Sequence, residues 1–375
     1  MFPSSVTTSR VRAVTRRVDR CDGAVGVRLA LPGGPCARAD GCRCAGGGRV
    51  QTLLWIALTV VGGGFIAAQS RVNGELGSRI GDPYAAALIS FGLGFVLLMF
   101  AAVGSRSRGG ALPSVVRAVR EGRLAWWQVL GGAGGALLVF SQSLTTPLLG
   151  VALFTIAVVA GQTAGGLLVD RAGLGPAGVQ SVTARRLIGA LLVIAAVAVT
   201  VGGRIEGGFP YALLLFPFCS GLANAFQQAV NGRVRNATDA YTSTLLNFAV
   251  GTGVLLVAFL IHGLVGGFTA ELSGTPWYLF LGGPFGIVFI GISVVAVAPL
   301  GVLRLALSLV TGQLIGSVLL DLLLPGANTV VTVWTFVGLG VALLAVAFTS
   351  LPLPRRGGDG TIARPVHGLG PHRDE

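Results

Sequence analysis

The sequence predicts an all-α integral membrane protein with ten transmembrane helices, arranged as two inverted five-helix repeats. Of its 375 residues, 53% are hydrophobic and only 11% are charged, which is too little polar surface to cover a water-soluble domain. The chain also repeats itself, because QSRVNG at 69–74 returns as QQAVNG at 227–232. Arginine is divided unequally between the equivalent loops of the two repeats. Together these observations place the chain in a lipid bilayer and divide it into two halves.

A second stretch of the repeat consists mainly of glycine and keeps a constant offset of 151 residues. Its two copies are Gly131, Gly135, Gly150, Gly161, Gln162, Gly165 and Asp170, and Gly282, Gly286, Gly301, Gly312, Gln313, Gly316 and Asp321. Each QxxVNG motif is also followed by an Asp-x-Tyr sequence, at Asp82 and at Asp239. A unit of about 150 residues is far longer than a solenoid repeat, so it predicts two domain-sized halves.

Ten apolar segments are long enough to cross a hydrocarbon core of about 30 Å, which needs roughly 20 residues. They are expected at 52–74, 84–104, 125–146, 149–170, 186–203, 209–232, 240–262, 277–298, 301–324 and 330–351. Transmembrane helices associate through small residues that let their backbones approach closely. Glycines four residues apart, such as Gly161 and Gly165, are therefore interpreted mainly as packing contacts between helices.

Five spans in each half would place the second half upside down relative to the first, and the arginines test this expectation. Cytoplasmic loops carry an excess of Arg. Segment 105–123 has five, whereas its repeat partner 263–276 has none; segment 171–186 has three, whereas its partner 325–329 has none. Equivalent loops are therefore expected on opposite sides of the membrane. The protein is expected in the inner or plasma membrane as a multi-pass protein with both termini in the cytoplasm.

The two ends of the chain differ in composition from the repeats. Residues 1–50 contain nine Arg and four cysteines without hydrophobic periodicity, so disorder is expected there. These cysteines lack the paired short spacing of a zinc module, and no metal site is expected. The favoured interpretation is a dispensable tail; an over-extended gene start, with translation from near Val50, is one explanation. The repeats are expected at 51–204 and 205–352, followed by a disordered tail at 353–375.

Related motifs recur in both halves: AAQSRVNGELG with DPYAAALISFGLGFVLL, NAFQQAVNGRV with DAYTSTLLNFAVGTGVLL, and the two G-Q-x-x-G helices. In these residues both halves resemble the YdcZ-like branch of the drug/metabolite transporter superfamily. The resemblance covers about 300 residues, from 51 to 351. The resemblance implies a ten-helix inverted-repeat carrier in the inner membrane of a bacterium, with a central cavity lined by both halves. The simplest members of the family resemble one five-helix half, whereas this chain fuses two.

Two pairs of uncharged amides are candidates for lining a solute pathway. Gln69 and Asn73 are four residues apart, as are Gln227 and Asn231, so each pair lies on one helical face. An amide that faces hydrocarbon without a partner costs several kcal/mol, so these faces must point inward or toward water. We interpret them as substrate-pathway residues. The alternative is that they hydrogen-bond one packed helix to another.

Five further polar residues lie within the predicted helices and complete the candidate pathway. They are Gln162, Gln313, Gln142, Ser90 and Asn247. The first two lie between glycines, and a packed glycine seam does not require a long amide. This favours a place on the pathway for both glutamines.

Asp170 and Asp321 are the acids nearest the bilayer, at the ends of equivalent helices. An intramembrane carboxylate is a candidate for function, and both are candidates for coupling transport to a proton or another ion. The alternative is that both lie at the depth of the lipid headgroups, where an aspartate is ordinary.

The sequence argues against an enzyme. It has three histidines, two of them in the C-terminal tail, and no Lys. A His-based metal or acid–base cluster within the membrane and a phosphate-binding loop ending in Lys are therefore both excluded. No cofactor is expected. No nucleic-acid partner is expected either, because basic stretches interleaved with aromatic residues are missing.

Two functions remain open at this point. The first is a secondary transporter, not driven by ATP, that moves a small polar or zwitterionic metabolite or drug-like solute by alternating access between inverted repeats. The second is a non-transporting membrane scaffold or assembly subunit, in which the amides only join helices. A cysteine placed at Gln69 or Gln227 distinguishes them, because it should react with a water-soluble thiol reagent in a transporter and stay silent in a scaffold.

Overall fold

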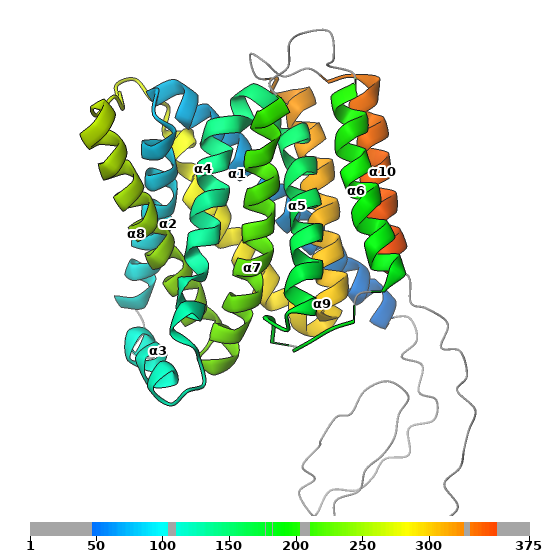
Figure 1. Ribbon diagram of the computed structural model, residues 1–375, viewed down its shortest axis with the longest axis horizontal. Coiled ribbons are helices and arrows are strands. Elements are labelled where there is room, and N and C mark those ends of the chain that lie inside the picture. The colour runs from blue at the N-terminus through cyan, green and yellow to red at the C-terminus, as the bar shows by residue number, and fades with distance from the viewer. Residues whose placement is uncertain are drawn as a thin grey trace, which may run out of the picture. The chain divides into compact units, whose positions relative to one another are not determined.

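The computed structural model describes residues 47–103, 110–176, 178–181, 183–202, 211–325 and 331–350. All regular elements in these residues are helices (Figure 1). The first helix begins at Gly47, slightly before the predicted start of the repeats at 51. The rest of the predicted N-terminal tail and the predicted C-terminal tail lie outside the described residues.

The helices fall into two halves that follow the sequence repeat. The first half comprises α1 (Gly47–Ile80), α2 (Pro83–Val103), α3 (Ala111–Arg120), η1 (Trp126–Gly131), α4 (Gly132–Leu149), α5 (Val151–Arg171) and α6 (Ala184–Gly202). The second half comprises η3 (Tyr211–Leu214), α7 (Leu215–Ala237), α8 (Ala240–Gly266), η4 (Trp277–Leu281), α9 (Gly282–Leu323) and α10 (Val333–Ser350). Each predicted span has a counterpart in these helices. By contrast, α3 lies in the segment 105–123 that the charge pattern assigns to a loop.

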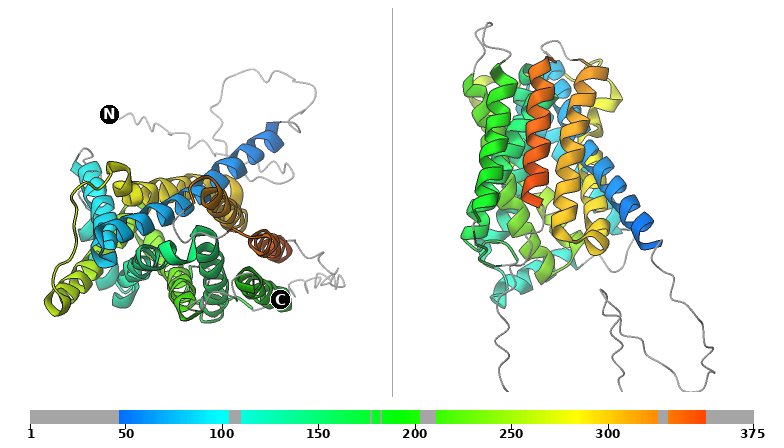
Figure 2. Two further views of the ribbon diagram at one scale, coloured as in Figure 1. Left: turned by 90° about the horizontal axis from the view of Figure 1, so that it is seen from above. Right: turned by 90° about the vertical axis from the view of Figure 1, so that its right-hand side faces the viewer.

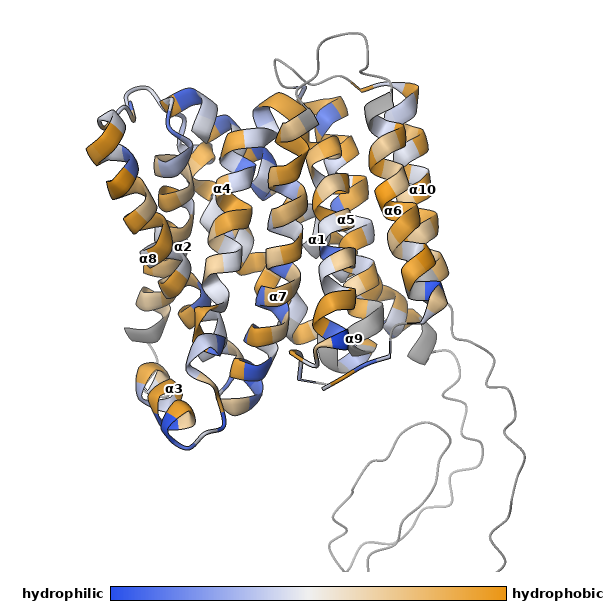
Figure 3. Cartoon of the chain, viewed as in Figure 1, coloured by the Kyte–Doolittle hydropathy of each residue, from blue (hydrophilic) through white to orange (hydrophobic). Residues whose placement is uncertain are grey.

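The described helices are those of a multi-pass membrane protein. Seven segments are long and apolar enough to cross a membrane: Val50–Ile80, Pro83–Ala101, Trp126–Leu149, Val151–Arg171, Ala212–Ala237, Ala240–Gly266 and Leu305–Leu323. Three shorter apolar helices accompany them at Leu187–Thr200, Trp277–Ser293 and Val333–Phe348. Hydrophobic residues dominate these helices (Figure 3), and Leu264 and Val265 are 81% and 87% exposed. Exposed apolar faces of this extent are stable against lipid tails rather than water.

Both helices that follow an Asp-x-Tyr sequence begin with an aspartate cap. Asp82 Oδ1 accepts hydrogen bonds from the backbone N–H of Tyr84 at 2.8 Å and of Ala85 at 3.1 Å. Asp239 Oδ1 accepts one from the backbone N–H of Thr242 at 3.0 Å. A side-chain oxygen in this position satisfies N–H groups of the first turn that have no partner within the helix. The start of a helix therefore explains why the aspartate is repeated.

Helix α9 contains two of the predicted spans, and it bends back on itself. It forms one helix of 42 residues, whereas the sequence predicts two helices here. Gly62 of α1 lies within contact distance of both Ile292 and Leu309. A straight helix would hold those two residues roughly 25 Å apart. The bend lies between them, as does Pro299, and a proline removes a backbone donor and kinks a helix.

The two halves pack against each other through glycines in equivalent positions. A Cβ on Gly161 of α5 would collide with the backbone of Phe218 in α7. A Cβ on the equivalent Gly312 of α9 would collide with the backbone of Val60 in α1, which is the equivalent of Phe218. Figure 2 shows α1 lying along α9, its most extensive partner. The same contact occurs twice with the halves exchanged, as a two-fold pseudosymmetry requires.

Helices α2 and α8 make another contact between the halves and run antiparallel. The rings of Phe91 and Phe248 lie 5.0 Å apart, centroid to centroid. A Cβ on Gly251 would collide with the ring of Phe91, and a Cβ on Gly94 would collide with the ring of Phe248. Residue numbers therefore rise along one helix as they fall along the other. These two equivalent helices, α2 and α8, therefore point in opposite directions.

Candidate functional site

A cluster of polar side chains joins α1 to α4; this first amide cluster consists of Ser70, Asn73 and Gln142. Asn73 Nδ2 donates a hydrogen bond to Gln142 Oε1 at 2.8 Å, and Gln142 Nε2 donates one to Ser70 Oγ at 2.9 Å. Ser70 Oγ donates in turn to the backbone oxygen of Ile66 at 3.0 Å. All three residues are fully buried. A connected chain of bonds satisfies groups that are costly to leave unpaired in an apolar interior.

Two oxygens beside the first amide cluster lack a partner and face the other half. Asn73 Oδ1 and Ser90 Oγ of α2 are buried, and neither has a hydrogen-bond partner among the described residues. Both lie against Gly282 of α9, where an added Cβ would collide with each of them. Only glycine leaves room at this point for an amide from α1 and a hydroxyl from α2. We call the contact between the halves along Gly131, Gly161, Gly282 and Gly312 the seam. At Gly282 it brings two unpaired polar atoms together.

The second amide cluster joins α7 to α8 and consists of Gln227, Asn231 and Asn247. Gln227 Nε2 donates to Asn247 Oδ1 at 2.6 Å, and Asn231 Nδ2 donates to the same oxygen at 2.8 Å. Ser243 Oγ donates to the backbone oxygen of Asn231 at 2.9 Å. Gln227 and Asn247 are buried, and Asn231 is half-buried. One amide oxygen thus holds two donors from the neighbouring helix.

The second amide cluster also lies against the opposite half. Gln227 Oε1 is buried and has no hydrogen-bond partner among the described residues. Asn231 Oδ1 would lie 2.6 Å from a Cβ on Gly131 of η1, the equivalent of Gly282. Each cluster is therefore held together within one half and covered by a glycine of the other.

The remaining pathway candidates are not bonded into either cluster. Gln69 is half-buried beside the first cluster, with its Oε1 placed 3.3 Å from the position of a Cβ on Gly286. Gln162 is half-buried and Gln313 is buried. The backbone nitrogen of Gln313 would lie 2.7 Å from a Cβ on Gly63 of α1. The structure thus brings five of the nine candidates into two clusters, places Gln69 and Ser90 beside the first cluster, and leaves the other two glutamines elsewhere.

Asp321 holds the N-terminus of α5. Its Oδ1 accepts a hydrogen bond from the backbone N–H of Val151 at 3.0 Å, and its Oδ2 accepts one from that of Ala152 at 2.7 Å. Gly150, with φ at 78°, turns the chain sharply before this helix, a conformation that favours glycine. Bonds from the first N–H groups of a helix to a carboxylate are charge-assisted. The buried carboxylate therefore has a structural use.

The acidic candidates do not meet in one site. Asp170 is half-buried at the other end of α5, where its backbone oxygen accepts a bond from the N–H of Gln180 at 2.8 Å. Asp321 lies at the start of α5. In the part of the chain that the structure describes, no three or more His, Cys, Asp or Glu residues gather to hold a metal ion.

Ser70 is the one cluster residue that the sequence does not predict. It precedes Asn73 by three residues and so lies on the same helical face, which is the available signal. A comparison of the two repeats does not identify it, because its equivalent in the second half is Gln228, which is exposed. A bonded position in one half therefore corresponds to a surface position in the other.

These features define a helical membrane protein built from a duplicated unit, with uncharged polar clusters at the seam between its halves. The sequence matches the family described as "Putative inner membrane exporter, YdcZ" at residues 54–199 and again at residues 212–348. The chain belongs to this family, and the predicted fusion of two YdcZ-like repeats is confirmed. The family is one of membrane exporters and not a class of enzyme. No curated protein matches the chain.

Proposed function

We propose that the protein is a secondary transporter that exports a small polar or zwitterionic solute across the inner membrane by alternating access. In this proposal ten helices cross the membrane, five in each of two inverted repeats at 51–204 and 205–352, and both termini are cytoplasmic. The supporting observation is the reciprocal seam, in which antiparallel equivalent helices α2 and α8 pack around glycines. The direction follows the description of the family.

The unpaired atoms of the seam suggest the class of solute. Asn73 Oδ1, Ser90 Oγ and Gln227 Oε1 are buried acceptors without a partner among the described residues. A buried polar group left unpaired costs about 1 to 3 kcal/mol. A solute that carries amine, amide or hydroxyl donors offsets this cost when it enters the seam. We therefore propose a donor-rich solute without a net charge. Coupling to a proton or another ion would need a group that the clusters do not contain.

Opening the seam at one glycine or the other would give alternating access. Separating Gly282 from α1 and α2 exposes Asn73 and Ser90, whereas separating Gly131 from α7 exposes Asn231. Because equivalent helices run in opposite directions, the two openings lead to opposite sides of the membrane in this proposal. The transporter then alternates between two arrangements of the same reciprocal contacts, which is the behaviour of inverted-repeat carriers.

A non-transporting membrane scaffold is the second candidate, and the bonding of Gln142 favours it. Both the oxygen and the nitrogen of this fully buried amide have partners within the first half. Interhelical bonds of this kind join helices without requiring water or a solute. A scaffold would keep the seam closed at all times.

Cysteine accessibility separates the two candidates. In a chain whose five native cysteines are replaced by serine, we expect Gln69→Cys and Gln227→Cys to react with a membrane-impermeant maleimide. Ala136→Cys, at a fully buried position of α4, is the matched control and should stay unlabelled. If both glutamine positions are as silent as the control, the seam does not open to water and the transport proposal fails.

The solute can be found by thermal stabilisation of the full chain in detergent. Small zwitterionic amino acids, amides and polyols are compared with acids of similar size, and the donor-rich uncharged or zwitterionic solutes should raise the unfolding temperature. A stabilising solute should also protect Gln69→Cys from the maleimide. Stabilisation without protection would place the binding site away from the first amide cluster.

A further inference from the structure

Helix α3 lies at one end of the bundle (Figure 1). The chain leaves the apolar helix α2, forms α3, and enters the membrane segment that begins with η1. A segment in this position lies where the hydrocarbon core meets water. The equivalent residues 267–276, between α8 and η4, contain no helix. A helix at this boundary is therefore a feature of the first half alone.

One side of α3 attaches it to the second half. Val115 and Ala118 are buried, and Ala118 packs in a hydrophobic cluster with Leu124 and with Val234 of α7. The contacts of α3 with α7 and α8 fix its position at the end of the bundle. The two remaining sides are exposed and differ in chemistry.

The second side of α3 is apolar. Leu112 is 70% exposed and Val116 is 41% exposed. These residues are four apart and so lie one above the other on the helix surface. Trp126, at the start of η1, is 70% exposed as well, and tryptophan is enriched where a membrane meets water. The apolar side can therefore be buried in the outer part of the hydrocarbon region.

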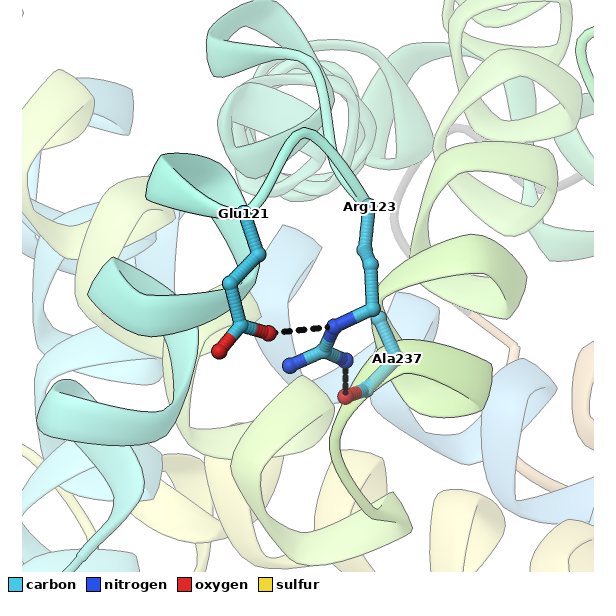
Figure 4. A network of polar contacts seen from close by, with 3 residues as sticks. All are labelled: Glu121, Arg123 and Ala237. Carbon is cyan, nitrogen blue, oxygen red and sulfur yellow. Dashed lines mark hydrogen bonds and ion pairs between the residues drawn. The ribbon is translucent and has the colours of Figure 1, made fainter.

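The third side of α3 is basic and lies next to the apolar one. Arg117 and Arg120 are exposed, three residues apart, and without a partner among the described residues. Arg123, just beyond the helix, is engaged instead: its side chain donates to Glu121 Oε2 at 2.8 Å and to the backbone oxygen of Ala237 at 2.6 Å (Figure 4). Glu121, the acid next to α3 in the sequence, is therefore already paired with Arg123.

We infer that α3 lies in the membrane interface and that Arg117 and Arg120 bind the phosphate groups of anionic phospholipids. A helix with adjoining apolar and basic sides binds an interface through both apolar burial and attraction to anionic lipid. The guanidinium group donates two parallel hydrogen bonds to a phosphate. The apolar side alone would also fit a protein, but the arginines beside it select an anionic bilayer surface. This binding does not depend on the proposed transport.

The test compares two short-chain lipids added to the full-length protein in detergent. Dioctanoyl phosphatidylglycerol should raise the unfolding temperature more than dioctanoyl phosphatidylcholine. In the double variant Arg117→Gln with Arg120→Gln, the phosphatidylglycerol concentration for half-maximal stabilisation should rise roughly twenty-five-fold, since each Arg near an anionic surface contributes about five-fold. An equal response to the two lipids in the wild-type chain would overturn the inference.

A matched double variant controls for total charge. Arg171→Gln with Arg235→Gln removes the same charge from two exposed positions on α5 and α7. The half-maximal concentration of phosphatidylglycerol should stay close to the wild-type value. If this pair weakens the response as much as the pair on α3, the lipid senses only net charge and the assignment to α3 is wrong.

Spin labels measure the depth of the helix in vesicles of phosphatidylcholine and phosphatidylglycerol. A label at Leu112→Cys, in a chain without native cysteines, should be more accessible to oxygen than to a water-soluble nickel complex. A label at Arg117→Cys should show the opposite preference. If both labels prefer the nickel complex, α3 lies off the membrane. If Leu112→Cys is shielded from both reagents, a protein surface covers it, and either result contradicts the inference.

Discussion

The two amide clusters lie along the same seam but are built differently. In the first half the bridging amide is Gln142 of α4; its equivalent is Ser293 of α9, whose hydroxyl donates to Phe289 of its own helix at 2.8 Å. In the second half the bridging amide is Asn247 of α8; its equivalent is Ser90 of α2, which has no partner among the described residues. Each half therefore places its third amide on a different helix.

The glycines of the seam do not differ in this way. Gly131 and Gly282 each approach an amide of the opposite half, and Gly161 and Gly312 each approach a backbone oxygen. Each glycine contact forms twice, once with the glycine supplied by the first half and once with it supplied by the second. It therefore constrains both halves. A hydrogen bond inside one half constrains that half alone. Reciprocal packing fixes the seam, whereas the polar groups beside it differ between the halves.

The largest expected effect is an all-or-none difference in membrane topology. A reporter fused after residue 110 should lie in the cytoplasm, and one fused near residue 268 should lie outside. The reason is that these loops are equivalent and the halves are proposed to be inverted. A fusion after residue 355 should match the one after residue 110. Matching signals at 110 and 268 would refute the inverted arrangement.

The next effect concerns the reciprocal glycines. Gly161→Ala and Gly312→Ala should each destabilise the protein by about 3 kcal/mol, because the new methyl group meets backbone that cannot move aside. Chemical unfolding of the purified protein measures both. Gly166→Ala and Gly291→Ala, where the space is open, are the controls and should be neutral or slightly stabilising. A large loss at only one of the two seam glycines would break the reciprocity.

Asn247 and Ser90 occupy equivalent positions but should respond differently to alanine. Asn247→Ala leaves the donors of Gln227 and Asn231 without their shared acceptor, at a cost of about 2 kcal/mol. Ser90→Ala removes a hydroxyl that has no partner among the described residues and should cost almost nothing. The same unfolding measurement compares them. Equal losses of unfolding free energy would mean that Ser90 forms a hydrogen bond in the membrane that stabilises the protein as much as Asn247 does.

Gln142 and Ser293 should show the smallest contrast. Gln142→Ala removes the acceptor of Asn73 and should cost about 1 kcal/mol, since bonds between membrane helices contribute modestly. Ser293→Ala removes only a bond within α9 and should cost a few tenths of a kcal/mol. A double change should be additive, because the two residues have no common partner. A larger cost for Ser293→Ala would show that α9 relies on this serine at the seam.

Local patterns in the sequence predict the repeat, the positions of the helices and the family. Hydropathy, glycine spacing and the QxxVNG motif are properties of neighbouring residues, and they are read without knowing how helices pack. The family match at 54–199 and 212–348 confirms the two copies. The pairing of Gly161 with α7, and of Gly312 with α1, explains why glycine recurs at a fixed offset.

The contacts between distant segments are not predictable in the same way. Asn73 and Gln142 are 69 residues apart, and only the packing of α1 on α4 selects them as partners. The use of Asp321 as a cap for α5 depends equally on a tertiary contact. In the sequence, the arginines of α3 indicate a cytoplasmic loop rather than a helix. Their charges obscure the helical spacing of the two apolar residues Leu112 and Val116.

The reciprocal seam also sets an order of events during synthesis. α1 is made first, yet its most extensive partner is α9, which begins at Gly282. The hydrogen bonds of Gln142 to Asn73 and Ser70 need only α1 and α4, so they can form early. The glycine contacts between the halves must wait until most of the chain has been inserted, and such distant contacts form slowly. A ribosome that stalls before α9 therefore leaves a first half with its amides paired and α1 without its main partner.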